Sequence, residues 1–424
     1  MNMVDSGQGP VPGRARGPVM VHVVSRVTEE VFSFLGPAIA ALNSHGVAQL
    51  VVALDEPSTR RLLQRLDAQV QVRLVPTRGR LVGDLLRLRR VTIDMLRTQQ
   101  ELEGIHLHGL IPCAIGASVA ATLGIRVPLY FSPHGSRLLG PARLLGKAVL
   151  WVSRRHGGAA IRSPIASHMF DLQRLERVVD SRVSLIESPV QRLFREVERR
   201  ESIAPTIVGG GPNPADDAIA MFIQLVVLMR DTAAQPQFCW MGPVKADQAA
   251  RLRSAGVRLV DRDDEADRAR LLSEAWIYLA PAGGRGVPVG LTEAMAAGVA
   301  CVAADTPYHH EVVGNRVSGF LYQTQAEAVQ LIAALLDSPQ QRCSAGQAAR
   351  AEAARRFDDA AFSRRLLEAY EQAGQPAAAQ VSRSTASRSA EGSGNAGTSA
   401  TDAAERGGGY VAGAGVALRR TEVL

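Results

Sequence analysis

Short apolar runs rich in β-branched residues alternate with longer amphipathic stretches along most of the chain. In the first half, stretches such as Glu30–Asn43 and Leu81–Gln99 carry the spacing of helices. Apolar runs that alternate with helices are typical of a parallel sheet covered on both faces. The strands predicted for this half are Val19–Val24, Leu50–Asp55, Val70–Val75, Ile105–Gly109, Val127–Phe131, Ala159–Ser163 and Val183–Glu187.

The second half repeats this rhythm. A helix is predicted from Ala215 to Arg230, directly after the first apolar run of this half. The strands predicted here are Pro205–Gly209, Gln237–Gly242, Val257–Asp261, Trp276–Ala280, Ala300–Ala304 and Gly319–Gln323. Two such units in tandem predict an α/β protein with two doubly wound, Rossmann-like domains.

The division of the chain follows from changes in composition. A charged helix end meets a new apolar run near Arg199–Pro205, which places a domain boundary there. Both chain ends are rich in small and turn-forming residues, with almost no large apolar side chains in the tail, so we expect them to be disordered. The predicted segments are a disordered start (1–17), an N-terminal domain (18–200), a C-terminal domain (201–355), a terminal helix (356–373) and a disordered tail (374–424).

Charge and cysteine content indicate the kind of partner and the cellular compartment. The 424 residues carry a net charge of +7, but residues 18–200 contain 25 Lys and Arg against 15 Asp and Glu. A basic first half suggests an anionic partner for that half. The start of the chain has no apolar run of the secretory type, and the four cysteines show no CxxC pair. We therefore expect a cytoplasmic protein with reduced thiols.

The segment Gly286–Gly319 carries the most specific pattern, GVPVGLTEAMAAGVACVAADTPYHHEVVGNRVSG. A glycine-rich strand end feeds a helix that begins near Pro288–Gly290. The unpaired backbone N–H groups of such a helix start, at Val289, Gly290 and Leu291, can bind a diphosphate. Glu293 follows one turn later and can accept hydrogen bonds from ribose hydroxyls. The alternative is that Glu293 caps its own helix and that the glycines only turn the chain.

This segment resembles the donor-binding motif of family 4 of the retaining glycosyltransferases, which have the GT-B fold of two Rossmann-like domains facing a cleft. The FSPHG loop (Phe131–Gly135) resembles a loop of the family's N-terminal domain, and His134 matches the histidine that faces the donor sugar in relatives. LIESPVQRLF (Leu185–Phe194) resembles the interdomain linker. RFDDAAFSRRLLEAYEQ (Arg356–Gln372) resembles the terminal helix that crosses back onto the N-terminal domain. For His106 and His108, which alternate around Leu107 on one strand face, we favour packing or a supporting role over metal binding.

Two positions depart from the family pattern. Relatives carry a Glu-x7-Glu pair that ends at the position of Glu293, and the first Glu is here Arg285. Relatives also carry an Arg and, five residues later, a Lys that neutralise the leaving diphosphate; here these positions hold Gly211 and Asp216. Loss of two cations facing a diphosphate should raise the barrier by several kcal/mol. Arg285 and Lys245 are the candidate substitutes for contact with the donor sugar or phosphate.

Two functions follow from these observations. The first is a retaining glycosyltransferase that moves a sugar from a UDP- or GDP-linked donor to a glycan or lipid-linked glycan, in synthesis of the exopolysaccharide or lipopolysaccharide type. Its site would use His134, Glu293 and the helix start, with no metal and no cofactor besides the donor. The second is a non-catalytic GT-B-like partner or scaffold of a glycan-synthesis enzyme, favoured by Arg285, Gly211 and Asp216. A nicotinamide-dependent enzyme is disfavoured because no GxGxxG follows the first strand.

The basic stretches Arg78–Arg90 and Arg137–Arg155 mix Arg with Leu and Val. Stretches of this kind can lie on the anionic inner face of a membrane. The alternative is a solvated Arg face over a packed helix. Nucleic acid is disfavoured as a partner because aromatic residues are not interleaved with the basic ones and no nucleic-acid-binding module is recognisable.

Overall fold

The fold is that of a computed structural model of the 424-residue chain. The structure describes residues 17–134, 161–177, 179, 181–211, 214–230, 232, 234–260, 265–283 and 287–374. The basic stretch Arg137–Arg155 and nearly all of the two chain ends predicted to be disordered lie outside these residues.

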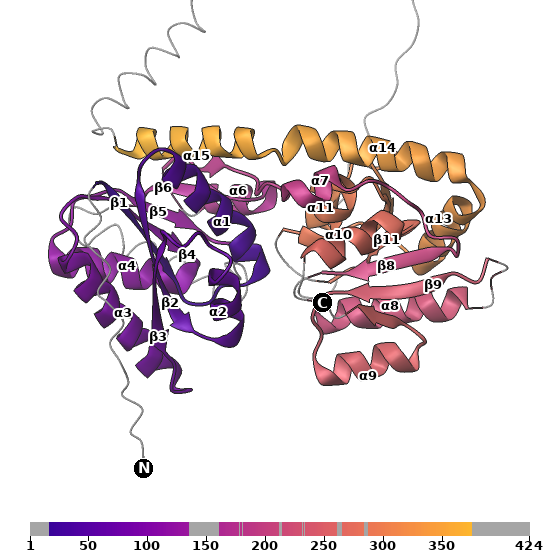
Figure 1. The fold of residues 1–424 in the computed structure, drawn as a ribbon, viewed down its shortest axis with the longest axis horizontal. Coiled ribbons are helices and arrows are strands. Elements are labelled where there is room, and N and C mark those ends of the chain that lie inside the picture. Colours follow the sequence, from indigo (N-terminus) through magenta and orange to yellow (C-terminus); the bar gives the residue numbers. More distant parts are fainter. Residues whose placement is uncertain are drawn as a thin grey trace, which may run out of the picture. The chain divides into compact units, whose positions relative to one another are not determined.

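The first half of the chain forms a parallel sheet of seven strands in the order β3-β2-β1-β4-β5-β6-β7 (Figure 1). Its centre is almost entirely apolar: every residue of β1 is buried, because helices cover both faces. The strands are β1 (Val19–Val24), β2 (Ala48–Asp55), β3 (Gln71–Pro76), β4 (Leu102–His108), β5 (Leu129–Ser132), β6 (Ile161–Ala166) and β7 (Ser184–Leu185).

Helices of the first half begin and end at recognisable sequence signals. Thr28 caps the first helix by accepting a hydrogen bond from the N–H of Val31 at 3.3 Å. Gly124 ends the fourth in the left-handed conformation, which favours glycine. The helices are α1 (Glu29–Ser44), α2 (Pro57–Leu63), α3 (Leu81–Arg97), α4 (Leu110–Leu123), α6 (Met169–Glu176) and α7 (Arg192–Glu196).

The second half forms a parallel sheet of six strands in the order β10-β9-β8-β11-β12-β13. The strands are β8 (Thr206–Gly210), β9 (Gln237–Met241), β10 (Arg258–Val260), β11 (Ile277–Ala280), β12 (Ala300–Ala304) and β13 (Phe320–Tyr322). The helices are α8 (Asp216–Met229), α9 (Ala246–Ser254), α10 (Glu265–Glu274), α11 (Val289–Ala296), α12 (Pro307–Val312), α13 (Gln325–Asp337) and α14 (Pro339–Arg356).

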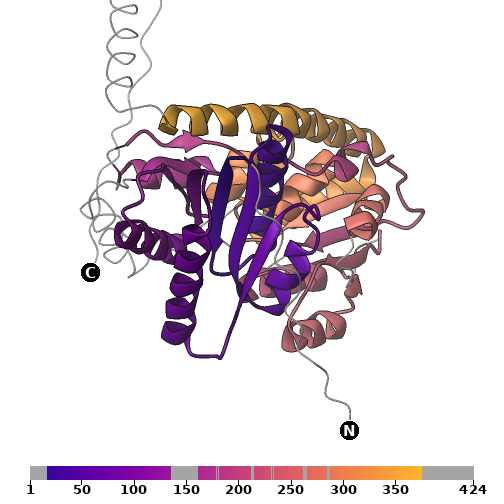
Figure 2. The same cartoon turned by 60° about the vertical axis from the view of Figure 1, so that its left-hand side comes forward.

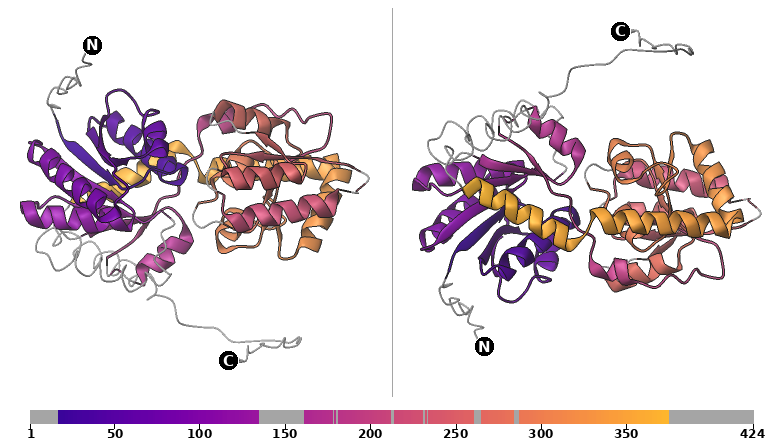
Figure 3. Two further views of the ribbon diagram at one scale, coloured as in Figure 1. Left: turned by 90° about the horizontal axis from the view of Figure 1, so that it is seen from below. Right: turned by 90° about the horizontal axis from the view of Figure 1, so that it is seen from above.

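The last described helix, α15 (Asp359–Gly374), packs against α1 and β6 of the first half. Its Phe362, Leu366 and Tyr370 join Phe34 of α1 in one buried cluster. Figures 1 and 3 show α15 continuing the line of α14, Figure 1 shows it passing over α1, and Figure 2 brings the strands beneath it forward. The chain thus returns to its first sheet at the end of its described part.

The sequence pattern predicted the sheets well. Each of the thirteen apolar runs contains or overlaps an observed strand, so the prediction of two doubly wound α/β units is confirmed. Cys113, Cys239 and Cys301 are buried, and none of the four cysteines forms a disulfide. In the part of the chain that the structure describes, no helix is long and apolar enough to cross a membrane. The domain boundary near residue 200 stays a prediction.

Candidate functional site

The predicted helix start lies where the sequence places it. Helix α11 begins at Val289, directly after Pro288. Its first turn lies close in space to the end of β8. A Cβ on Gly290 would lie 2.7 Å from the carbonyl oxygen of Gly210 and 2.5 Å from the hydroxyl of Tyr278. Only glycine permits this approach, which brings the start of the helix to the carboxyl ends of the strands.

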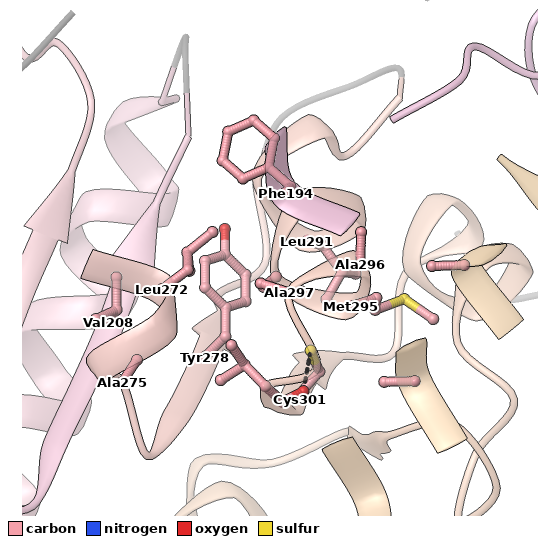
Figure 4. Packing of buried hydrophobic residues seen from close by; sticks show 14 of the residues in the cluster. Phe194, Val208, Leu272, Ala275, Tyr278, Leu291, Met295, Ala296, Ala297 and Cys301 are labelled. Atoms are coloured by element: carbon pink, nitrogen blue, oxygen red, sulfur yellow. Dashed lines mark hydrogen bonds between the residues drawn. The ribbon is translucent and has the colours of Figure 1, made fainter. Parts of the chain in front are cut away.

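The inner side of α11 packs into a hydrophobic core beside the second sheet. Leu291 and Met295 are buried with Phe194 and Tyr278, as Figure 4 shows. The Tyr278 hydroxyl donates a hydrogen bond to the carbonyl of Gly210 and so ties β11 to the end of β8. The N–H groups of Val289 and Leu291 have local carbonyl partners, Val287 and Pro288, each at 2.9 Å. A diphosphate at this helix start would therefore compete with two short local bonds.

Glu293 is a buried carboxylate with one oxygen in use. Its side chain is 5% exposed, and Oε1 accepts a hydrogen bond from the guanidinium of Arg268 at 2.7 Å. Its Oε2 is buried and has no hydrogen-bond partner among the described residues. Burial raises the pKa of Glu293, while the positive charge of Arg268 acts in the opposite direction. A buried acceptor with no partner costs free energy, so this oxygen is suited to a ligand hydroxyl.

A small cavity borders Glu293. It has a volume of about 60 Å³ and is lined by Glu29 and Phe32 of α1, by Val190, and by Arg268, Val289 and Glu293, among others. Ligand pockets usually measure roughly 300–1,000 Å³. A nucleotide at Glu293 would therefore extend beyond this cavity.

The glycines at the end of β8 differ in how much room they leave. A Cβ on Gly210 would collide with the backbone of Met241, whereas a Cβ on Gly211 would meet no described atom within 4 Å. Gly211 stands where the resemblance to the family implies an Arg, and no described residue there blocks a side chain. Lack of space around Gly211 therefore does not explain why this loop has no Arg.

Asp216, at the position of the relatives' Lys, starts α8. It accepts a hydrogen bond from Gln248 at 2.6 Å and lies 3.9 Å from the ammonium of Lys245. Acidic residues are favoured in the first turn of a helix, where Asp216 and Asp217 lie. Lys245 thus brings a positive charge back beside the position where relatives carry theirs, although both side chains are more than 60% exposed.

Arg285 lies outside the described residues, so its predicted contact with a donor stays a prediction. The next described residue in this loop, Val287, donates its N–H to the carboxylate of Glu30 in α1 at 3.3 Å. Burial raises the pKa of Glu30 to about 8, and the negative charge of Asp171 adds to this effect.

His134 follows β5 and has a left-handed backbone, with φ of 49°. This conformation is uncommon for a residue with a side chain and often marks a functional position. His134 is the end of a stack of imidazole rings that also includes His22 of β1 and His106 and His108 of β4. The rings of His106 and His108 are 4.1 Å apart, and those of His108 and His134 are 5.2 Å apart. The prediction that His106 and His108 share a face is confirmed.

Burial lowers the pKa of every histidine in this stack, to about 4 for His22 and about 3 for His134. Each imidazole is therefore neutral at physiological pH. His106 bonds to the Tyr370 hydroxyl at 2.5 Å and to the Ser132 hydroxyl at 2.8 Å, which uses both of its nitrogens.

Potential ligand atoms of His22, His106 and His108 lie within 4.8 Å of one another, as in a three-histidine metal site. However, each ring nitrogen of these three residues already has a hydrogen-bond partner. A metal would have to break several of these bonds, so the residues fit a hydrogen-bonded cluster better than a metal site.

Three residues of these sites had no signal in the sequence. Arg268 reaches Glu293 from 25 residues earlier, and Gln49 and His22 join the histidine stack from neighbouring strands. Helix periodicity and strand alternation describe only local neighbours. Once the order of the parallel strands is known, the pairing of His22 with His106 in β1 and β4 identifies the stack.

Comparison with known proteins agrees with the resemblance seen in the second half. Residues 204–338 match the family model described as "Glycosyl transferases group 1". No curated protein matches the sequence.

Solved structures match nearly the whole described fold. HepE of Anabaena, in complex with UDP and glucose, is 15% identical with a TM-score of 0.65, covering 82% of this chain and 98% of that one. Sucrose-phosphate synthase of Thermosynechococcus elongatus is 15% identical with a TM-score of 0.67, covering 84% and 99%. S. aureus TarM, a mutant in complex with fondaparinux, α-GlcNAc-glycerol and UDP, is 9% identical with a TM-score of 0.65, covering 83% and 99%. This protein therefore has the GT-B fold.

Proposed function

We propose that this protein is a retaining glycosyltransferase that uses a UDP- or GDP-linked sugar. The observation that carries the proposal is Glu293, which presents a buried, unpartnered carboxylate oxygen one turn into α11. This helix lies within the segment that matches the group 1 model. HepE, which shares the fold, was solved with UDP and glucose.

The two carboxylate oxygens of Glu293 differ in their contacts, and this difference suits the binding of a ribose. Arg268 donates a hydrogen bond to Oε1 and keeps the side chain in one orientation, so Oε2 can accept a hydrogen bond from a ribose hydroxyl without further rearrangement. A hydroxyl donor would satisfy the buried acceptor at little entropic cost. The start of α11 carries the positive end of the helix dipole and would lie beside the diphosphate.

His134 would contact the donor sugar from the first domain. Its position after β5, at the carboxyl end of a parallel strand, is where α/β sheets bind ligands. Its neutral imidazole would orient the sugar and would not supply a positive charge.

Neutralisation of the leaving diphosphate is the step for which the chain differs most from its relatives. Lys245 is the candidate cation because it lies beside Asp216 at the start of α8. Arg285 is the second candidate, from the loop before α11. Electrostatic stabilisation of a leaving group is usually the largest catalytic contribution, so both charges should matter for turnover more than for substrate binding.

The acceptor that we propose is a glycan or a lipid-linked glycan of the exopolysaccharide or lipopolysaccharide type. Helix α3 exposes Leu81, Val82 and Leu86 at 66%, 70% and 62%, within the basic stretch Arg78–Arg90. Apolar side chains flanked by Arg favour contact with the anionic inner face of a membrane.

Sedimentation with phosphatidylglycerol vesicles tests this contact. The wild type is expected to sediment with the vesicles, and the triple change Leu81→Ser, Val82→Ser and Leu86→Ser should abolish this binding. Equal sedimentation of the wild type and the triple variant would contradict a role of this helix at the membrane.

Gly211 and Asp216 favour a second candidate, a non-catalytic GT-B-like partner of a glycan-synthesis enzyme. Restoring the relatives' charges with Gly211→Arg and Asp216→Lys separates the two candidates. A site that has lost its function should gain nucleotide binding from the double change. A site rewired around Lys245 should gain nothing or be harmed.

Thermal unfolding with UDP and GDP tests the proposed donor site. A ligand at about 100 times its Kd raises the stability of the folded state by about 2.7 kcal/mol. We expect one nucleotide at millimolar concentration to raise the Tm of the wild type and not that of Glu293→Gln. Glu274→Gln, which alters an ion-paired carboxylate at the surface, is the matched control and should respond like the wild type. No shift with either nucleotide would favour the non-catalytic partner.

A further inference from the structure

A chain of hydrogen bonds runs across three neighbouring strands of the first sheet, β2, β1 and β4, and ends at His134, which follows β5. It starts at Gln49 of β2, whose Oε1 lies 2.9 Å from His22 Nε2. His22 Nδ1 lies 3.0 Å from His108 Nε2, and His108 Nδ1 lies 2.9 Å from His134 Nε2. His134 Nδ1 is buried and has no partner in the described part of the chain.

The orientation of the Gln49 amide is set independently of the histidines. Its Nε2 donates to the carbonyl oxygen of Val47 at 2.8 Å, so Oε1 is the atom that faces His22. Oε1 can only accept a hydrogen bond. His22 must therefore carry its proton on Nε2.

This first proton decides all the others, because a neutral imidazole has one donor and one acceptor nitrogen. With Nε2 protonated, His22 Nδ1 is an acceptor, so His108 must donate from Nε2. His108 Nδ1 is then an acceptor in turn, and His134 must donate from its own Nε2. The remaining nitrogen, His134 Nδ1, is left with a lone pair and no proton.

We propose that Gln49, His22 and His108 are positioning residues that fix the tautomer of His134, so that its Nδ1 is a hydrogen-bond acceptor reserved for a ligand hydroxyl or N–H. This proposal rests on the proposed function and assigns His134 Nδ1 to a hydroxyl of the donor sugar. It excludes a phosphate or carboxylate oxygen as the partner, because such an oxygen has no proton to donate and would be repelled by the lone pair of Nδ1.

The surroundings support a fixed direction for the chain. Gln49, His22 and His108 are at most 2% exposed, so water does not compete for their nitrogens. Burial lowers the pKa of each of the three imidazoles in the chain, which keeps the neutral form that the argument requires. Phe34 packs edge-on against His108 and His134 and holds both rings in place.

His106 supplies a matched control. It stacks on His108 in the same buried cluster, but its nitrogens bond to Tyr370 and Ser132 and not to the chain. Tyr370→Phe therefore removes a histidine hydrogen bond of similar burial without touching the Gln49–His134 chain.

Long-range ¹H–¹⁵N spectra of the protein labelled with ¹⁵N-histidine report the tautomer of each ring without any ligand. We expect His22, His108 and His134 to carry the proton on Nε2 in the wild type and in Tyr370→Phe. In Gln49→Leu the direction of the chain should no longer be fixed, and the Nδ1 signals of His134 should show a mixture. A proton on His134 Nδ1 in the wild type, or nitrogen signals typical of bound zinc, would overturn the proposal even if Gln49→Leu did not fold.

Titration with UDP and with UDP-glucose then tests the consequence for the ligand. The ratio of the two Kd values isolates the contribution of the sugar. We expect Gln49→Leu to reduce this contribution about twofold, because roughly half of the mixed His134 tautomers would keep an unprotonated Nδ1, and Tyr370→Phe to leave it unchanged. An equal ratio in wild type and Gln49→Leu would overturn the assignment to the sugar. Failure of UDP to bind any variant would instead contradict the proposed function, while the spectra still decide the tautomer.

Discussion

The buried histidines make a specific prediction about stability at acid pH. In the folded protein, burial and the neighbouring imidazoles of His22 and His134 lower the pKa of His106 well below its ordinary value of 6.5. Unfolding exposes the ring and lets it bind a proton. A histidine whose pKa is lower in the folded than in the unfolded state stabilises the folded protein at pH values above the unfolded pKa. This stabilisation is lost as the pH falls from the unfolded pKa toward the folded pKa.

The change His106→Gln isolates this contribution, because glutamine does not titrate. Between pH 7.5 and 5.5 an unfolded histidine of pKa 6.5 gains about 1.4 kcal/mol from proton binding, while folded His106 gains almost nothing. The variant is expected to be less stable than the wild type at pH 7.5, because two hydrogen bonds to hydroxyls are altered. That difference in unfolding free energy should shrink by about 1.4 kcal/mol at pH 5.5.

Urea unfolding followed by circular dichroism at several pH values measures the difference. Ser132→Ala is the control: it removes a hydrogen bond of His106 but keeps the ring that titrates. Its difference from the wild type should not depend on pH. A difference for His106→Gln that stays constant from pH 7.5 to 5.5 would mean that folded His106 binds a proton, and the account of the stack would be wrong.

Two further predictions follow from single positions. Folded Glu30 has a pKa of about 8 against 4.5 in its ordinary state, so the stability that its protonated form contributes is present below pH 4.5 and is lost as the pH rises to 8. In urea unfolding, the unfolding free energy of Glu30→Gln should therefore fall less than that of the wild type between pH 5 and 8. Parallel curves of unfolding free energy against pH for the two proteins would refute this. Gly290→Ala should destabilise by about 1–3 kcal/mol, because its Cβ would lie 2.7 Å from the Gly210 carbonyl oxygen. Gly211→Ala, whose Cβ meets no described atom within 4 Å, should stay within about 0.5 kcal/mol in the same assay, and equal losses for the two would show that the close approach does not matter.

The fold could be predicted from the sequence because buried parallel strands leave a direct local signal. Runs such as Val19–Val24 are apolar throughout, apart from His22, and helices α1 and α8 follow the strands in the expected places. The runs at Val183–Glu187 and Val257–Asp261 were predicted longer than the strands that form, β7 and β10, which have two and three residues. Hydrophobicity alone does not decide how many of those residues find a partner strand.

The site was predicted in part. Glu293 and the start of α11 are neighbours in the sequence, so the motif places them together. The partner of Glu293, Arg268, and the chain from Gln49 to His134 depend on which strands and helices become neighbours in space. These contacts join residues 25 or more positions apart, and no local pattern encodes them.

The central claim is that Glu293 accepts a ribose hydroxyl of a bound nucleotide. Isothermal titration of wild type and Glu293→Gln with UDP and with 2′,3′-dideoxy-UDP tests it most directly, because the four Kd values form a double-mutant cycle between carboxylate and hydroxyls. We predict that the wild type prefers UDP about 10- to 100-fold, as expected for a hydrogen bond to a charged group, and that Glu293→Gln largely loses this preference. Equal binding of the two nucleotides by the wild type, or the same preference in both proteins, would contradict the account.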